Sequence, residues 1–139
     1  MIADELIRAV TSWAVDQVDI ISVALVGSRA RGDARSDSDV DFVIQCVRPA
    51  SYLEEQTWIS EFGIAQTVSI EDWGIVQSIR VFYADGVEVE YGITSSEWVT
   101  FPLDEGTITV LHGGVVVLVD RNGSLTRAVE WVRNAPGGK

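Results

Sequence analysis

Apolar and polar positions along this chain repeat with periods that predict helices and strands in alternation. Residues 2–18 place apolar side chains every three or four positions, which is typical of an amphipathic helix. Residues 20–26, IISVALV, form a continuous apolar run rich in β-branched side chains and end at Gly27, as a buried strand does before a turn. In residues 39–46, DVDFVIQC, the aspartates are two positions apart and alternate with apolar residues, so we expect a strand with its aspartates on one face.

The same reading continues to the C-terminus and predicts a mixed α/β (α+β) fold. We find no internal repeat or linker, so we expect one domain over residues 1–139, with no separate C-terminal helical domain. A sheet of about five to six strands with helices mainly on one face fits this order. The further elements expected are helices over 52–61, 94–99, 103–111 and 125–133, and strands over 64–70, 75–83, 87–93 and 115–120.

Charge and cysteine content exclude several classes of function. The chain has 10 basic and 21 acidic residues and a formal net charge of −11, which argues against binding duplex DNA or an anionic membrane. Its single cysteine, Cys46, excludes an internal disulfide and a zinc cluster of several thiolates. No apolar run reaches the roughly 18 residues of a membrane span, and the N-terminus does not resemble a signal peptide. We therefore expect a cytoplasmic protein.

One segment concentrates basic and acidic side chains in an order that suits a phosphate ligand. Residues 25–46, LVGSRARGDARSDSDVDFVIQC, hold three of the nine arginines within seven positions. Gly27 permits a tight turn that lets a phosphate approach the backbone, and the hydroxyl of Ser28 suits a phosphate oxygen. Arg29 and Arg31 offer forked donors to phosphate oxygens. These residue types predict a triphosphate-binding turn.

Asp39 and Asp41 are candidate metal ligands. Their spacing of two on a predicted strand places both carboxylates on one face, where they can share a divalent cation that bridges phosphate oxygens. A third acid on a neighbouring strand would complete such a site. Glu88 and Glu90 are the candidates, because both lie on the alternating segment VEVEYGI, and either could reach the aspartate pair.

The segment of residues 25–46 resembles the signature of the polymerase-β-like nucleotidyltransferase superfamily, which here reads Gly27-Ser28, ten intervening residues and then Asp39-Val40-Asp41. That superfamily includes aminoglycoside adenylyltransferases and the minimal nucleotidyltransferases that pair with small helical toxin proteins. The resemblance implies that Asp39 and Asp41 bind Mg²⁺ and that a following strand, similar to residues 85–91, supplies the third acid. The register of residues 85–91 against that strand favours Glu90 over Glu88 as the third acid. The resemblance further implies that the Gly27-Ser28 turn binds the triphosphate, and together with the residue types above we expect Gly27, Ser28, Arg29, Arg31 and Ser38 to bind the nucleotide.

The resemblance also implies a reaction. A nucleoside monophosphate, AMP from ATP, would pass to a hydroxyl of a small molecule or protein, with Mg²⁺ bound and pyrophosphate released. Two alternatives stay open: an antitoxin-type protein that acts on or binds a helical partner, and a nucleotide-binding module without catalysis. A homodimer is a further expectation. Trp73 and Trp98 are the tryptophans that we expect to be placed for stacking on a base.

Overall fold

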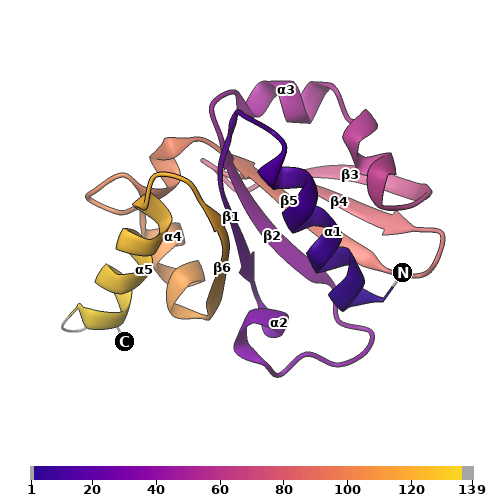
Figure 1. The fold of residues 1–139 in the computed structure, drawn as a ribbon. Coiled ribbons are helices and arrows are strands. Elements are labelled where there is room, and N and C mark those ends of the chain that lie inside the picture. The colour runs from indigo at the N-terminus through magenta and orange to yellow at the C-terminus, as the bar shows by residue number, and fades with distance from the viewer. Residues whose placement is uncertain (1, 136–139) are drawn as a thin grey trace.

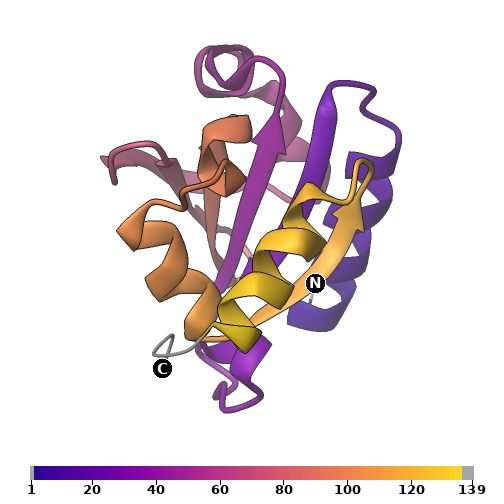
Figure 2. The same ribbon diagram turned by 90° about the vertical axis from the view of Figure 1, so that its left-hand side faces the viewer.

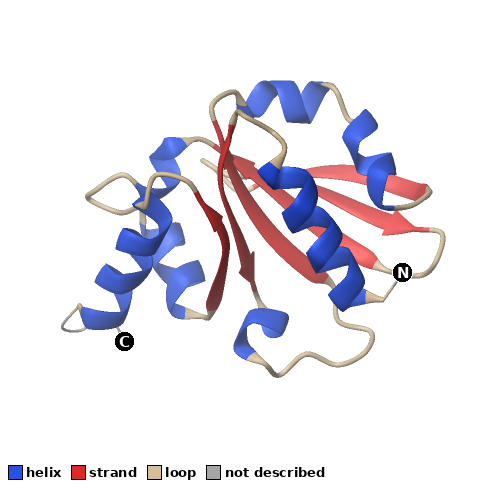
Figure 3. Ribbon diagram, in the orientation of Figure 1, coloured by secondary structure: helices blue, strands red, loops and turns tan. Residues whose placement is uncertain are grey.

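A computed structural model describes residues 2–135 and shows a six-stranded mixed sheet with helices against it (Figure 1, Figure 3). The strand order across the sheet is β3-β4-β5-β2-β1-β6. The strands are β1 (Ile20–Val26), β2 (Val40–Cys46), β3 (Ala65–Asp72), β4 (Gln77–Tyr83), β5 (Glu88–Thr94) and β6 (Val115–Asp120). The mixed α/β class predicted from the sequence is confirmed.

The helices divide between the two faces of the sheet. Those of the first half of the chain are α1 (Ala3–Val15), α2 (Ser28–Arg31), α3 (Pro49–Glu54) and the 3₁₀ helix η1 (Thr57–Phe62). Those of the second half are the 3₁₀ helix η2 (Ser96–Val99), α4 (Glu105–His112) and α5 (Ser124–Asn134). α1 packs against β1 and β6 on one face, whereas α4 and α5 stand together beside β6 on the other (Figure 1, Figure 2). The helices therefore cover both faces, more evenly than we expected.

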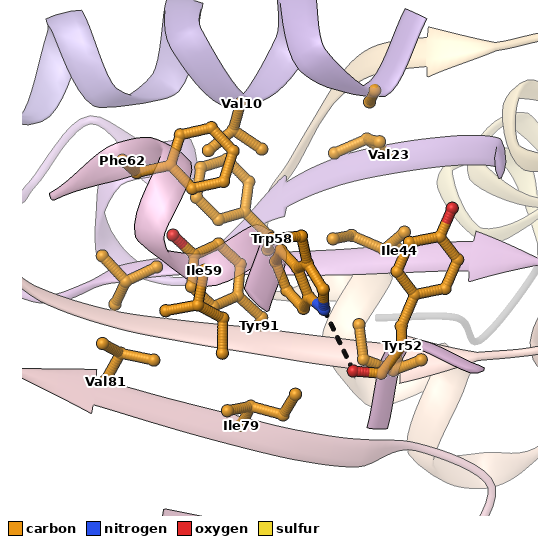
Figure 4. Close-up of a cluster of buried hydrophobic side chains, with 14 of the residues drawn as sticks. Val10, Val23, Ile44, Tyr52, Trp58, Ile59, Phe62, Ile79, Val81 and Tyr91 are labelled. Carbon is orange, nitrogen blue, oxygen red and sulfur yellow. Dashed lines mark hydrogen bonds between the residues drawn. The ribbon is translucent and has the colours of Figure 1, made fainter. Parts of the chain in front are cut away.

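The larger core lies between α1, η1 and the face of the sheet that carries the apolar residues of each alternating strand. Aromatic side chains fill its centre (Figure 4). The Trp13 and Trp58 rings stack at 5.1 Å between centroids, and Trp58 meets Tyr91 edge-on at 4.9 Å. Trp58 Nε1 donates a hydrogen bond of 3.0 Å to the Tyr52 carbonyl, so its buried N–H is paired.

The smaller core lies on the opposite face, over β1, β2 and β6. Trp98, Leu111 and Leu125 are its large buried members, contributed by η2, α4 and α5. This core covers one part of that face only, whereas Arg80 of β4 and Glu88 and Glu90 of β5 lie on the part that it leaves open. The uncovered part is where the acidic residues gather.

Two elements differ from the sequence prediction. The expected helix over 52–61 is instead α3, which begins at Pro49, followed by the 3₁₀ helix η1. Proline is favourable in the first turn, and Ser51 donates its hydroxyl hydrogen bond to the Arg48 carbonyl rather than capping a later helix. The first helix ends at Val15 rather than 18, and the Arg121 guanidinium donates hydrogen bonds to the carbonyls of Ala14, in its last turn, and of Gln17, just beyond it.

Among the described residues no helix is both long and apolar enough to cross a membrane.

Candidate active site

Asp41 of β2 lies directly beside Glu90 of β5, because these two strands pair in parallel with Asp41 opposite Glu90. Both strands begin at the end of the sheet where antiparallel β1 finishes. The turn after β1 and the first residues of β2 and β5 therefore meet at this end. Arg80 of β4 is opposite Glu90 on its other side, so Arg80, Glu90 and Asp41 form a row across three adjacent strands.

Asp39, Asp41 and Glu90 form the group that we call the acid triad. One carboxylate oxygen from each lies within 4.8 Å of the others, and all three residues are partly buried. Desolvation by burial, with Asp39 and Glu90 nearby, raises the pKa of Asp41 to about 8. The sequence named all three of these residues, and the structure brings them together.

The acid triad fits a divalent cation. Asp41 Oδ1 is buried and accepts no hydrogen bond from the described residues, so a ligand is the group that would satisfy it. The ligand atoms offered are carboxylate oxygens, which suit hard cations such as Mg²⁺. A cation there would also offset the repulsion that raises the Asp41 pKa.

Arg80 is a site residue that the sequence analysis did not single out. Its guanidinium lies within 3.5 Å of Asp39 Oδ2 and 3.3 Å of Glu90 Oε2, and Nη1 also contacts Glu88. Nε and Nη2 bind the two oxygens of Glu71 at 3.4 and 3.3 Å. The hydrogen bonds to Glu71 and Glu88, with the charge of Glu90, raise the Arg80 pKa above its usual range. One signal was available: a lone arginine in the apolar strand 75–83, on the face of Ser78 and Phe82.

Gly27 lies against the acid triad. Its backbone has φ of 77° and ψ of −157°, a combination that only glycine adopts readily. A Cβ atom at this position would lie 2.5 Å from Asp41 Oδ2. The turn expected to bind phosphate is therefore next to the carboxylates expected to bind metal, and Ser28 opens α2 directly after it.

The arginines of the motif separate into two roles. Arg29 Nη2 donates hydrogen bonds to the carbonyl of Ser38 at 2.7 Å and that of Arg35 at 3.5 Å, so Arg29 holds the loop before β2. The Ser38 hydroxyl accepts a hydrogen bond from the Arg35 N–H and belongs to the same loop. Arg31, by contrast, lines the cleft beside the acid triad, with its Nε 3.2 Å from Asp33.

A cleft of about 700 Å³ opens next to the acid triad on the uncovered part of the sheet. Asp41 and Glu90 form one side of it, and the N-terminal part of α4 forms another. Its volume is in the range of pockets that hold small molecules and cofactors. The remaining lining is mostly apolar and includes Val43, Ile75, Val76, Trp98 and Val110.

The two tryptophans expected near a base differ in exposure. Trp73, in the turn between β3 and β4, lines the cleft and is 63 % exposed, so its ring is free for stacking. Trp98 is 2 % exposed and belongs to the smaller core, with part of its surface at the cleft wall. Trp73 is the better placed of the two.

Residues 7–83, which are 77 of the 139 residues, match the family model described as a nucleotidyltransferase domain. The matched range contains the turn at Gly27, both aspartates and Arg80, whereas Glu90 lies beyond it. No curated protein sequence matches the chain.

A solved structure shows a similar fold. A crystal structure of an aminoglycoside 6-adenyltransferase from Bacillus subtilis superposes with a TM-score of 0.55 at 16 % identity, covering 68 % of this chain and 35 % of that one. A complex of CCA-adding enzyme with CTP covers 94 % of this chain and 35 % of its own, at 14 % identity and a TM-score of 0.47. The chain thus spans about a third of the length of these two proteins.

Proposed function

The chain belongs to the nucleotidyltransferase domain family, and on that premise we propose that it transfers AMP from ATP to a hydroxyl group, with Mg²⁺ bound and pyrophosphate released. The observation that carries the proposal is the acid triad placed against the Gly27 turn. It puts a candidate metal site and a candidate phosphate site in direct contact. The cleft beside them offers room for a nucleoside and an acceptor.

Asp39, Asp41 and Glu90 are the residues that would hold Mg²⁺. When bound there, the ion supplies positive charge to the phosphate oxygens and orients them for attack. The protein's own part is to keep the three carboxylates converged before the nucleotide arrives, which the parallel pairing of β2 with β5 does. This preorganisation removes an ordering cost from the reaction.

The triphosphate is proposed to lie along the Gly27-Ser28 turn, where no Cβ stands between the backbone and the Asp41 carboxylate. Arg31 lines the same cleft and is the motif arginine proposed to contact the phosphates. Arg29 and Ser38 act indirectly, since their hydrogen bonds organise the loop that leads to Asp39. Their proposed contribution is to position the metal ligands.

The acceptor hydroxyl is proposed to lose its proton to Glu90. Arg80 contacts Glu90 Oε2, so Oε1 is the oxygen proposed to take the proton. Glu88 lies outside the acid triad, and its carboxylate pairs with Arg80. The structure therefore supports Glu90 over Glu88 as the third acid. The acceptor is proposed to enter through the open side of the cleft, past Trp73.

Calorimetry with a non-hydrolysable ATP analogue tests the nucleotide site. We expect binding that requires Mg²⁺ and is lost in Asp39→Ala, whereas Asp37→Ala, which alters an exposed loop carboxylate, should bind as the wild type does. Equal binding with and without Mg²⁺ would contradict the metal assignment. Transfer itself is measured as pyrophosphate release from ATP in the presence of a panel of hydroxylated small molecules.

A further inference from the structure

Five carboxylates and one guanidinium gather at the proposed active site. Arg80 contacts four of them, and it is the one cation among the described residues that does so. Its side chain is 24 % exposed, so solvent screens these ion pairs less than it would at an open surface. The five carboxylates belong to Asp39, Asp41, Glu71, Glu88 and Glu90.

Two of the four carboxylates that contact Arg80 lie outside the acid triad, and two belong to it. Glu71 binds Arg80 through two nitrogens, and Glu88 binds Nη1, so these two acids fix the guanidinium in one orientation. From there the guanidinium reaches Asp39 Oδ2 at 3.5 Å and Glu90 Oε2 at 3.3 Å. Arg80 therefore contacts two members of the acid triad from the β4 side of the sheet.

Asp41 is the member that Arg80 does not reach. Asp41 lies one strand further from β4, and its buried Oδ1 has no hydrogen-bond partner among the described residues. A divalent cation that satisfied Asp41 would share Asp39 and Glu90 with Arg80, from the opposite side. The two cations would then bracket the same pair of carboxylates.

We propose that Arg80 is a built-in cation that takes the place of a second metal ion, so the nucleotide-free protein binds one divalent cation at the acid triad and none on the β4 side. Arg80 is a positioning residue in this view, because it acts on the reaction through Asp39 and Glu90. The inference rests on the proposed function for its assignment of the metal ligands.

The physical reason is competition for the same oxygens. A second cation would find an all-oxygen site in the carboxylates of Glu71 and Glu88 together with the two oxygens that face Arg80, Asp39 Oδ2 and Glu90 Oε2. The covalently attached guanidinium occupies it without a loss of translational freedom, which a free ion would have to give up on binding. Removing the guanidinium leaves the four carboxylates without a counter-charge, and a metal ion is then the group that restores it.

The test is the number of Mn²⁺ ions bound per chain, measured by calorimetry and electron paramagnetic resonance without nucleotide. We expect about one ion for the wild type and about two for Arg80→Met, which removes the charge and offers no oxygen ligand. Arg80→Lys keeps a cation and should stay at about one. Arg8→Met, the same change at an exposed position of α1, is the matched control and should also stay at about one.

The position of the second ion is tested by adding Glu88→Gln to Arg80→Met. The double variant should lose the second ion and keep the first. Two ions in the wild type, or one ion in a folded Arg80→Met protein, would overturn the proposal. If Arg80→Met does not fold, a count of two ions in the wild type or in Arg80→Lys still overturns the proposal. Because no nucleotide is present, failure here is separate from failure of the proposed transfer, which the ATP-analogue and pyrophosphate assays report.

Discussion

Gly27 and Asp41 lie so close that a Cβ atom at position 27 would stand 2.5 Å from Asp41 Oδ2. Gly27 directly follows β1 and Asp41 is the second residue of β2, and these two strands are antiparallel neighbours. The absence of a side chain at position 27 therefore leaves room for the carboxylate on which the proposed metal site depends.

Gly27→Ala should lower both stability and activity. The new Cβ meets the Asp41 carboxylate, and alanine disfavours the φ of 77°, so we expect a stability loss of about 1–3 kcal/mol. Transfer should fall much more than this loss explains, because the Asp41 carboxylate must move. Urea unfolding and kcat/KM measure the two effects.

Gly123→Ala is the matched control for that experiment. Gly123 has φ of 78° and ψ of −2°, in the left-handed region, and nothing within 4 Å of a Cβ, so alanine there meets a milder backbone strain than at position 27 and no clash. It should lose stability and keep its activity. If Gly27→Ala behaves like Gly123→Ala, the close approach to Asp41 has no functional role.

Asp41→Asn should remove a pH-dependent loss of stability. Burial raises the folded-state pKa of Asp41 from 3.8 to about 8, so the folded protein holds a proton that the unfolded chain releases at lower pH. The free energy of unfolding therefore falls, through this group, as pH rises from about 4 to about 8. The difference in stability between Asp41→Asn and the wild type without metal should increase in favour of the variant over that window.

Mg²⁺ should reverse the effect of pH on the wild type but not on Asp41→Asn. Thermal unfolding at pH 5, 7 and 8.5, with and without Mg²⁺, measures both trends. A wild-type curve parallel to that of Asp41→Asn would contradict the raised pKa.

Glu90→Gln should reduce transfer far more than Glu88→Gln. A metal ion contributes several kcal/mol to stabilising charge in the transition state, so a lost ligand should cost about 100-fold or more in kcat/KM. Glu88 pairs with Arg80 outside the acid triad, and we expect a loss below about tenfold there. The reverse order would assign the third acid to Glu88.

Trp73→Ala should weaken nucleotide binding about tenfold, which is the scale of one base stacked on one aromatic ring. Its ring is exposed at the cleft and so is free to stack. Trp131→Ala is the control, since Trp131 is 45 % exposed on α5 and contacts Phe101 away from the cleft. Calorimetry with the ATP analogue measures both variants. Equal affinities would place the base elsewhere.

The sequence alone predicted the site residues that depend on local pattern. Asp39 and Asp41 share a face because a strand repeats every two residues, and Gly27 was identified because a buried apolar run stops there. The choice of Glu90 over Glu88 came from the family resemblance. The sheet then places Glu90 directly opposite Asp41, while Glu88 contacts Arg80.

Only the tertiary structure decided what Arg80 and Arg29 contact. Arg80 is separated by 41 residues from Asp39 and meets it because β4 pairs with β5 and β5 with β2, an order that no local period encodes. Arg29 was predicted to contact phosphate, and in this fold its Nη2 donates to the Ser38 carbonyl of the loop before β2, since a flexible side chain binds whichever carbonyl the fold brings within reach. Local periodicity determines which face a residue occupies, whereas strand order determines which charges share that face.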